Sequence, residues 1–267
     1  ADYGWLGELR SLLKKDVPFI CLTATATDAT RKVIVKELCM EECVVVENDP
    51  NRLNTKYSVL TPRTNNLYRW FVWLIGELET EQQNTEKVII FCGRKEHMKE
   101  LYELFAEHLG DKSYYWRTDD RSRLFAMYHK RTHKLVKETI EKEFCKPDAF
   151  GMGFNVRNIY LDIHIGPSAD LDDYLQETGR IGRESTQMSH TVLLKFKEQE
   201  QRILCRREML LAQFNSSAPK DKVSHSCCDV CAMKCKCLCS CDDSDCSCEL
   251  KFEQEKHVSR IEKYFCG

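Results

Sequence analysis

Short apolar runs alternate with amphipathic stretches along this chain, and this alternation restricts the possible folds more than any other feature. Val88 to Cys92 and Ile159 to Ile165 are apolar-rich runs of strand length, and Thr191 to Phe196 is a third. Residues 96 to 109 carry an apolar stripe at helical spacing. Strands that alternate with helices predict an α/β fold built on a parallel sheet with flanking helices.

The first fifty residues repeat this pattern on a smaller scale. Val17 to Leu22 is an apolar run that predicts a buried strand, and Val44 to Val46 predicts a second strand. Between them we expect a helix over residues 29 to 38, capped by Thr27 or Asp28. Residues 48 to 54, with one proline and three asparagines, are typical of a linker.

Beyond the linker the sequence predicts a second α/β unit. Residues 56 to 60 are typical of a strand, and residues 67 to 78 of a helix that contains four aromatic side chains. Further helices are expected over residues 135 to 144, which are rich in lysine and glutamate, and over residues 171 to 178.

Composition alone names no function. The 267 residues include 42% hydrophobic and 31% charged residues, with a formal net charge of -2, so overall basicity does not argue for nucleic-acid binding. Residues 117 to 137 nevertheless hold seven lysines and arginines against two aspartates. No apolar run approaches the roughly 20 residues of a membrane span, and no signal-peptide pattern opens the chain. We therefore expect a soluble, intracellular protein.

Cysteine is concentrated near the end of the chain. Ten of the 16 cysteines lie between Cys205 and Cys248, which favours metal binding over a disulfide scaffold. Cys205 on a predicted helix, followed by the C-x-x-C pair Cys228 and Cys231, suits a tetrahedral structural zinc site. We favour Cys227 as the fourth ligand. His225 and Cys235 are the alternatives, and Cys235 to Cys248 can bind a second soft metal ion or form a cysteine-rich tail.

The segment from Gln176 to Glu184 carries the clearest chemical signal. Arg180 and Arg183 lie three residues apart, beside Gly179 and Gly182. Guanidinium groups stay charged and bind phosphate oxygens in pairs, while glycines permit close backbone approach. This pattern is typical of half of a nucleotide site.

Several motifs occur in the order of one known family. Their order along the chain is Thr23 to Thr27, Ala149 to Asn155, Ile159 to Gly166, Ser168 to Tyr174, the arginine segment, and Cys205 to Leu211. Together they resemble the C-terminal portion of a RecQ-type ATP-dependent DNA helicase of superfamily 2. The resemblance runs from about residue 5 to about residue 231.

This resemblance implies a fold, a reaction and a set of partners. Residues 1–52 correspond to the end of a first RecA-like lobe, residues 53–198 to the second lobe, and residues 199–267 to a helical zinc-binding module with a cysteine-rich tail. The implied activity is ATP hydrolysis, with magnesium, coupled to 3′-to-5′ unwinding of single-stranded or forked DNA. The implied location is the nucleus.

The resemblance also assigns site residues. It makes Arg183 the finger that reaches the γ-phosphate, with Arg180 in support and Gln176 bonding within the cleft. The residues assigned to nucleotide binding are Thr23, Thr25, Gly151, Gly153 and Asn155. Arg94 and Thr27 are assigned to DNA. Without the resemblance, Thr25 and Thr27 merely end a strand and cap a helix, and Arg94 is a surface arginine at a helix start.

Two features depart from the family pattern. The chain contains no Gly-Lys and no Asp-Glu dipeptide, so the phosphate-binding loop and the magnesium-binding acidic motif are missing, and we expect this chain alone to be inactive. The alternative function is a catalytically inactive zinc-containing module that binds nucleic acid or protein, or a product without stable activity. The segment before Ala149 is also shorter than in the family, which predicts a strained second lobe or a sheet one strand short.

Overall fold

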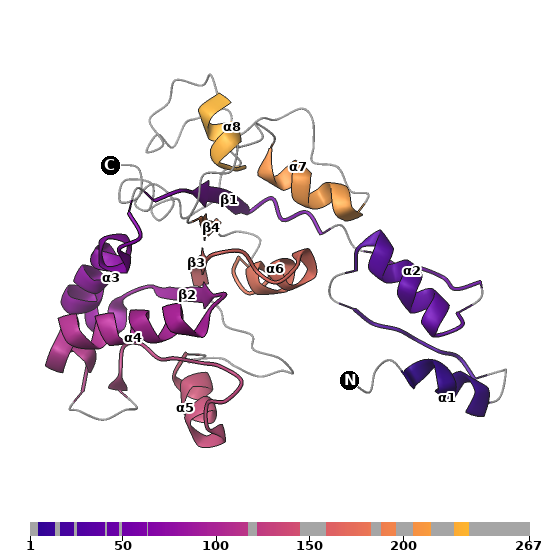
Figure 1. The fold of residues 1–267 in the computed structure, drawn as a ribbon, viewed down its shortest axis with the longest axis horizontal. Helices are drawn as coiled ribbons and strands as arrows, with labels where there is room; N and C mark the ends of the chain where they lie inside the picture. Colours follow the sequence, from indigo (N-terminus) through magenta and orange to yellow (C-terminus); the bar gives the residue numbers. More distant parts are fainter. Residues whose placement is uncertain are drawn as a thin grey trace.

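The computed structural model describes residues 5–13, 17–23, 26–40, 42–47, 50–62, 64–116, 122–144, 159–182, 188–195, 205–214 and 227–234. They form an α/β arrangement in which one sheet lies between two groups of helices (Figure 1). The predicted fold class is confirmed. None of the described helices is long and apolar enough to cross a membrane.

The sheet is parallel throughout, with strand order β1-β4-β3-β2. Its strands are β1 (Thr55–Leu60), β2 (Lys87–Cys92), β3 (Ile159–Ile165) and β4 (Ser189–Leu194). All four correspond to strands predicted from the sequence. β2 is half-buried rather than fully buried, because it is an outer strand of the described sheet.

The helices predicted over residues 29–38, 67–78, 96–109, 135–144 and 171–178 are also present, whereas the helix expected over residues 251–265 lies outside the described residues. The α-helices are α1 (Leu6–Leu12), α2 (Asp28–Glu37), α3 (Leu67–Glu81), α4 (Lys95–Leu109), α5 (Lys134–Phe144), α6 (Leu171–Thr178), α7 (Arg206–Leu211) and α8 (Asp229–Lys234). Single 3₁₀ turns are η2 (Gln82–Asn84), η3 (Gly110–Ser113) and η5 (Ala212–Phe214).

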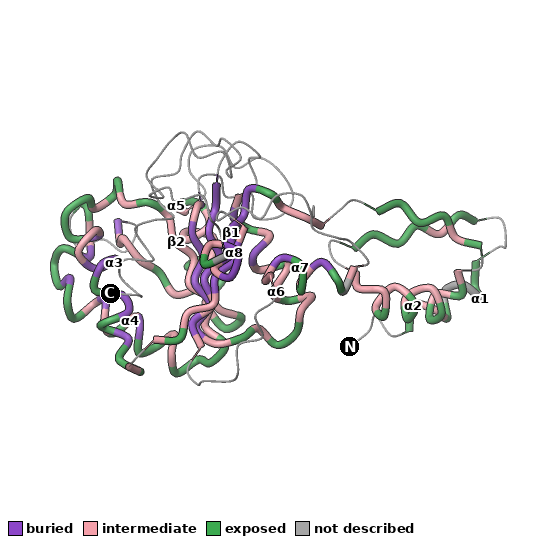
Figure 2. The backbone as a smooth tube through the Cα atoms, turned by 90° about the horizontal axis from the view of Figure 1, so that it is seen from above, coloured by how far each residue is buried: buried purple, intermediate pink, exposed green. Residues whose placement is uncertain are grey.

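One face of the sheet packs on α3 and α4 to form the main hydrophobic core (Figure 1). Phe71 is fully buried and meets Phe105 edge-on, with ring centroids 6.2 Å apart. From the sheet, alternate residues of β3 and β4 enter this core, among them Ile163 and Val192. In Figure 2 the buried residues gather along the strands.

The opposite face of β3 is polar where it meets α6. Asp162 and His164 alternate with the core residues of β3 and are almost fully buried. A parallel sheet covered on both faces is usually apolar on both. The exception places ionisable groups beneath the helix that leads into the arginine segment.

Two predicted strands near the start of the chain are wrong. Residues 18–23 and 43–47 belong to no helix or strand of the described chain, and Figure 2 shows these segments largely exposed beside α1 and α2. Leu22 and Val44 are each 89% exposed. Strands of a parallel sheet are normally buried beneath a covering layer, and most of these side chains are exposed.

Residues 145–158 lie outside the described part of the chain. The expected missing strand before Ala149 therefore stays a prediction.

Candidate functional site

The arginine segment follows α6 and turns back towards the sheet. Asp170 caps α6 by accepting a 2.7 Å hydrogen bond from the Asp173 amide, and the helix ends at Thr178. Gly182 then adopts a positive φ of 54°, which favours glycine, and its amide donates to the carbonyl of Ile159 at 3.3 Å. Ile181 between them is fully buried. The turn over residues 178–182, called here the arginine turn, therefore rests on a fixed base.

Two of the predicted catalytic residues lie on this base and a third does not fall within the described residues. Gln176 and Arg180 are exposed, at the end of α6 and in the arginine turn. Arg183 lies outside the described part, as do Thr25, Gly151, Gly153 and Asn155. Their predicted roles are therefore not tested here.

Beneath α6, His164 lies between two carboxylates. Its Nε2 is 3.7 Å from Asp162 Oδ2, and its Nδ1 is 3.4 Å from Glu177 Oε2. Burial lowers the pKa of His164, but the two carboxylates outweigh burial and raise it above its ordinary value. For the carboxyl group of Glu177, burial alone would raise the pKa. Hydrogen bonds from His164 and Ser168 and the charges of His164 and Arg180 outweigh burial and lower the pKa below its ordinary value. The cluster ties α6 to β3 electrostatically.

The arginine turn and Arg94 lie at opposite ends of the parallel strands. The arginine turn meets the start of β3, through the bond from Gly182 to Ile159. Arg94 follows the end of β2, at the N-terminus of α4, and is exposed. Because β2 and β3 pair in parallel from Lys87 with Ile159 to Cys92 with Ile165, one strand length separates the two, about 20 Å for six residues.

The N-terminal threonines have local structural roles. Thr27 caps α2, with its Oγ1 accepting from the Thr30 amide at 3.2 Å. Thr30 in turn donates to Asp172 Oδ2 at 3.1 Å, so this cap lies near the start of α6. The start of α6 and Arg94 both follow the C-terminal ends of strands, β3 and β2 respectively. Thr23 is exposed in an extended segment. Capping by Thr27 fits the structural alternative, and it leaves the predicted DNA contact untested.

Four cysteines from two distant segments converge at the outer edge of β1. The Sγ atoms of Cys205, Cys227, Cys228 and Cys231 all lie within 4.8 Å of one another. Cys205 Sγ is 3.6 Å from Cys227 Sγ and 3.9 Å from Cys228 Sγ. Sulfurs bound at about 2.3 Å to one tetrahedral zinc ion are about 3.8 Å apart. The donor type and the spacing both fit zinc.

The surroundings of this cysteine cluster favour a thiolate at Cys228 and protonated thiols at Cys227 and Cys231. Cys228 Sγ accepts hydrogen bonds from the amides of Arg206 and Cys231, each at 3.4 Å. Bonding from the Cys205 and Cys227 thiols, aided by these amides, lowers the pKa of Cys228, while burial raises the pKa of Cys231 to about 12. A metal ion that replaces the shared protons satisfies all four sulfurs together.

The cysteine cluster is attached to the sheet by backbone and side-chain bonds. The Tyr57 amide donates to the Cys227 carbonyl at 3.3 Å, and the Val59 amide to Asp229 Oδ2 at 3.4 Å. Asp229 also binds Arg206, at 3.1 and 3.2 Å. This attachment covers part of the free edge of β1.

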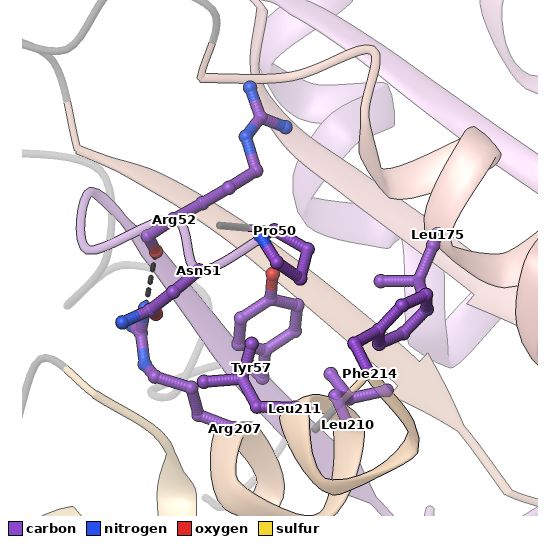
Figure 3. Close-up of a pocket in the computed structure, with 9 residues that line it drawn as sticks. All are labelled: Pro50, Asn51, Arg52, Tyr57, Leu175, Arg207, Leu210, Leu211 and Phe214. Carbon is purple, nitrogen blue, oxygen red and sulfur yellow. Dashed lines mark hydrogen bonds between the residues drawn. The ribbon is translucent and has the colours of Figure 1, made fainter. Parts of the chain in front are cut away.

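A small pocket lies between α6, which leads into the arginine turn, and α7, which follows Cys205. It lies between the linker, α6 and α7 (Figure 3). Its lining residues are Pro50, Asn51, Arg52, Tyr57, Leu175, Arg207, Leu210, Leu211 and Phe214. Most of this lining is apolar, and the guanidinium of Arg52 points away from the apolar lining residues in Figure 3.

Comparison with known proteins agrees with this arrangement. Residues 70–185 match the family model of the helicase conserved C-terminal domain. The ATP-dependent DNA helicase hus2/rqh1 of Schizosaccharomyces pombe is 27% identical over an alignment that covers 86% of this chain and 19% of the relative. The predicted resemblance to the RecQ-type helicases is confirmed.

Other RecQ-type relatives align with shorter or similar parts of the chain. The ATP-dependent DNA helicase RecQ of Pasteurella multocida is 25% identical, covering 86% of this chain and 38% of the relative. The ATP-dependent DNA helicase Q1 of Rattus norvegicus is 27% identical, covering 68% and 28%. The chain thus spans well under half the length of each of these relatives.

Sequence reasoning missed three residues that hold the arginine turn, the cysteine cluster and α6 in place. Arg52 and Arg207 connect the linker, the arginine turn and the cysteine cluster, and His164 anchors α6. A charged residue within a predicted strand was the available signal for His164. No local pattern marks Arg52, because its partners lie more than 120 residues away.

Proposed function

We propose that this chain is part of a RecQ-like ATP-dependent DNA helicase that couples ATP hydrolysis to 3′-to-5′ unwinding. In this proposal residues 53–198 are the second RecA-like lobe, residues 1–52 belong to the first lobe, and residues 199–267 are the zinc-binding module. The nuclear location follows from the same proposal. The observation that carries it is the arginine turn, held at the start of β3 in a parallel sheet, with Arg94 at the opposite end of the strands.

The proposed roles of the arginines follow from their charge. Arg183 and Arg180 neutralise the phosphate groups of ATP, and Gln176 hydrogen-bonds beside them. Removing an arginine finger lowers phosphoryl-transfer rates by about 10³ to 10⁵. Thr23, Thr25, Gly151, Gly153 and Asn155 complete the nucleotide side, and magnesium neutralises further charge when the acidic motif of the complete family member is present.

At the opposite end of the strands, Arg94 is proposed to contact a DNA phosphate, with Thr27 near it. Phosphate contacts position a strand without reading its sequence, and each released counterion adds to the salt dependence of binding. We therefore propose binding to single-stranded or forked DNA without base specificity. Zinc is proposed to bind Cys205, Cys227, Cys228 and Cys231 in a structural role, because four protein ligands leave no open position for substrate.

DNA binding can be tested on the chain as it stands. Fluorescence anisotropy with a labelled single strand should detect salt-dependent binding, and Arg94→Ala should reduce the slope of log affinity against log salt by about one. Arg69→Ala, at an exposed position in the first turn of α3, is the matched control. An equal effect of the two substitutions would contradict a specific contact by Arg94.

Hydrolysis is the second test. We expect no phosphate release above background from this chain with single-stranded DNA, because the sequence holds no phosphate-binding loop and no acidic magnesium motif. Turnover that disappears in Arg183→Ala would refute that expectation.

The absent motifs favour a second candidate, a catalytically inactive zinc-containing module that binds nucleic acid or protein. Sequencing the transcript upstream of the Ala1 codon separates the two candidates. A transcript that encodes a phosphate-binding loop and an acidic motif upstream of Ala1 supports the helicase. A transcript that encodes neither motif supports the binding module.

A further inference from the structure

A single side chain of the linker holds both ends of the arginine turn. Arg52 donates through Nη1 to the carbonyl of Thr178 at 3.2 Å and through Nη2 to the carbonyl of Gly182 at 2.9 Å. Asn54 Nδ2 also donates to the Gly182 carbonyl at 2.9 Å. The two carbonyls bracket Arg180, so the linker fixes the backbone from which Arg180 projects.

The backbone of Arg52 is in turn held by a second, buried arginine. Arg207 is 4% exposed, and its Nη1 donates to the Arg52 carbonyl and, at 3.1 Å, to Asn51 Oδ1 (Figure 3). Its Nη2 donates to the Thr55 carbonyl at 2.6 Å, and its guanidinium lies 5.5 Å from the centre of the Tyr57 ring. These contacts bind Arg207 to three successive parts of the linker and β1.

The remaining face of Arg207 meets the cysteine cluster. Its Nε donates to Cys227 Sγ at 3.3 Å. A site of four thiolates and one divalent metal carries two negative charges, and cations next to the ligands offset them. Arg206 already pairs with Asp229, whereas the guanidinium of Arg207 makes its described hydrogen bonds to neutral oxygens and to Cys227. Arg207 is therefore the cation best placed to sense the charge on the cluster.

We propose that Arg207 and Arg52 form a relay through which metal binding at the cysteine cluster orders the arginine turn. Metal turns Cys227 into a fixed thiolate, which holds Arg207 in its buried position. Arg207 then holds the linker backbone, and Arg52 holds residues 178–182. The coupling itself needs only the described contacts, and it rests on the proposed function in one respect, that the turn faces nucleotide phosphate.

Hydrogen–deuterium exchange of the full chain tests the relay without any ATP or DNA chemistry. The readout is exchange in peptides that cover residues 175–182, for zinc-loaded and chelator-treated protein. Losing one hydrogen bond of a charged group corresponds to roughly a tenfold change or more in a local opening equilibrium. We therefore expect metal removal to speed exchange in the turn at least about tenfold, while β3 amides such as Ile163 stay protected.

The variants separate a relay from general loosening. Arg207→Gln with zinc bound should exchange in the turn as fast as metal-free wild type, and Arg52→Gln should exchange fast in both metal states. Arg206→Gln is the matched control, because its side chain binds Asp229 but makes no described bond to the linker. It should retain the metal dependence of the turn.

Metal content is measured for every variant. If Arg207→Gln does not hold zinc, Arg52→Gln decides, because its side chain makes no described bond to the cysteines. The relay would be overturned if, in the wild type, metal removal speeds amide exchange in Cys228 to Ala232 but leaves exchange in residues 175–182 unchanged. Equal loss of coupling in Arg206→Gln would also overturn it. Because no catalytic readout is used, the helicase proposal can fail while the relay stands, and the reverse.

Discussion

Replacing His164 with glutamine removes a buried cationic group from between two carboxylates, and its cost can be worked out from the contacts. His164 is 1% exposed, with Asp162 at 3.7 Å and Glu177 at 3.4 Å. Unit charges at such distances attract by about 4 to 5 kcal/mol each at an effective dielectric constant of 20. Desolvation opposes this, and it raises the pKa of the buried Asp162 above its ordinary value. Removing one partner of a buried pair typically costs about 3 to 5 kcal/mol.

We expect His164→Gln to lower the free energy of unfolding by about 3 kcal/mol at pH 6. The effect should depend on pH with a definite sign. The folded pKa of His164 lies above the unfolded value of about 6.5. Its charge therefore contributes fully below about pH 6.5, and the contribution is lost as pH rises through the folded pKa.

A second buried histidine acts in the opposite direction and has to be separated. Burial, and then the charge of Lys56, lowers the pKa of His190 well below its ordinary value. His190 therefore costs stability as pH falls below about 6.5, in the wild type and in His164→Gln alike. The difference between the two proteins cancels this term. The ring contacts of His164 with Tyr174 and Phe91, at centroid distances of 4.9 and 4.8 Å, are lost in the variant.

The assay is urea unfolding of both proteins from pH 6 to pH 9. The double variant Asp162→Asn/His164→Gln is the control, because it removes the carboxylate that the single variant leaves without its cation. We expect the double variant to recover about 1 to 3 kcal/mol of the loss at pH 6. A stability difference that stays constant over this pH range, or no recovery in the double variant, would refute the electrostatic account.

Three further predictions address the cysteine cluster, the core and the arginine turn. Purified protein should hold one zinc ion per chain by metal analysis. Cys205→Ser should lose this ion, whereas Cys21→Ser, at an exposed position, should retain it. Structural zinc contributes roughly 10 to 16 kcal/mol of apparent binding free energy, so chelation should unfold the segment that follows β4. Phe71→Ala should lower the free energy of unfolding in urea by about 3 to 5 kcal/mol, because the Phe71 side chain is fully buried. Val72→Ala, at the half-exposed neighbouring position, should change it by less than about 1 kcal/mol. Similar values for the two variants would contradict the assigned core. Gly182→Ala should destabilise the protein by about 2 to 4 kcal/mol, because φ is positive there and a Cβ would lie 2.2 Å from Ser189 Oγ. In Gly76→Ala, in α3, the new Cβ meets no atom within 4 Å, and the variant should be more stable by roughly 0.5 to 1 kcal/mol. Melting temperatures that shift in the same direction for both variants would contradict the turn geometry.

Much of the second α/β unit could be predicted from the sequence because its signals are local. The apolar stripe of α4 and the apolar runs of β2 and β3 reflect the helical and extended periods directly. Cys205 and the C-x-x-C pair likewise indicated a cluster, which the structure brings together with Cys227. In contrast, the apolar runs at residues 17–22 and 44–46 predicted strands wrongly, because an isolated run does not reveal whether a sheet lies beside it.

Within the second α/β unit, the sequence by itself determined which segments form helices and which form the strands of one parallel sheet. Along the whole chain it determined which residue types are available for phosphate and metal. Only the tertiary structure decided how they are connected. It placed Arg94 and the arginine turn at opposite ends of the parallel strands, buried His164 under α6, and joined Arg52 and Arg207 to partners far along the chain. The physical reason is that periodicity is set by neighbouring residues, whereas a buried charge is placed by whichever distant acceptors the packing brings within hydrogen-bonding distance.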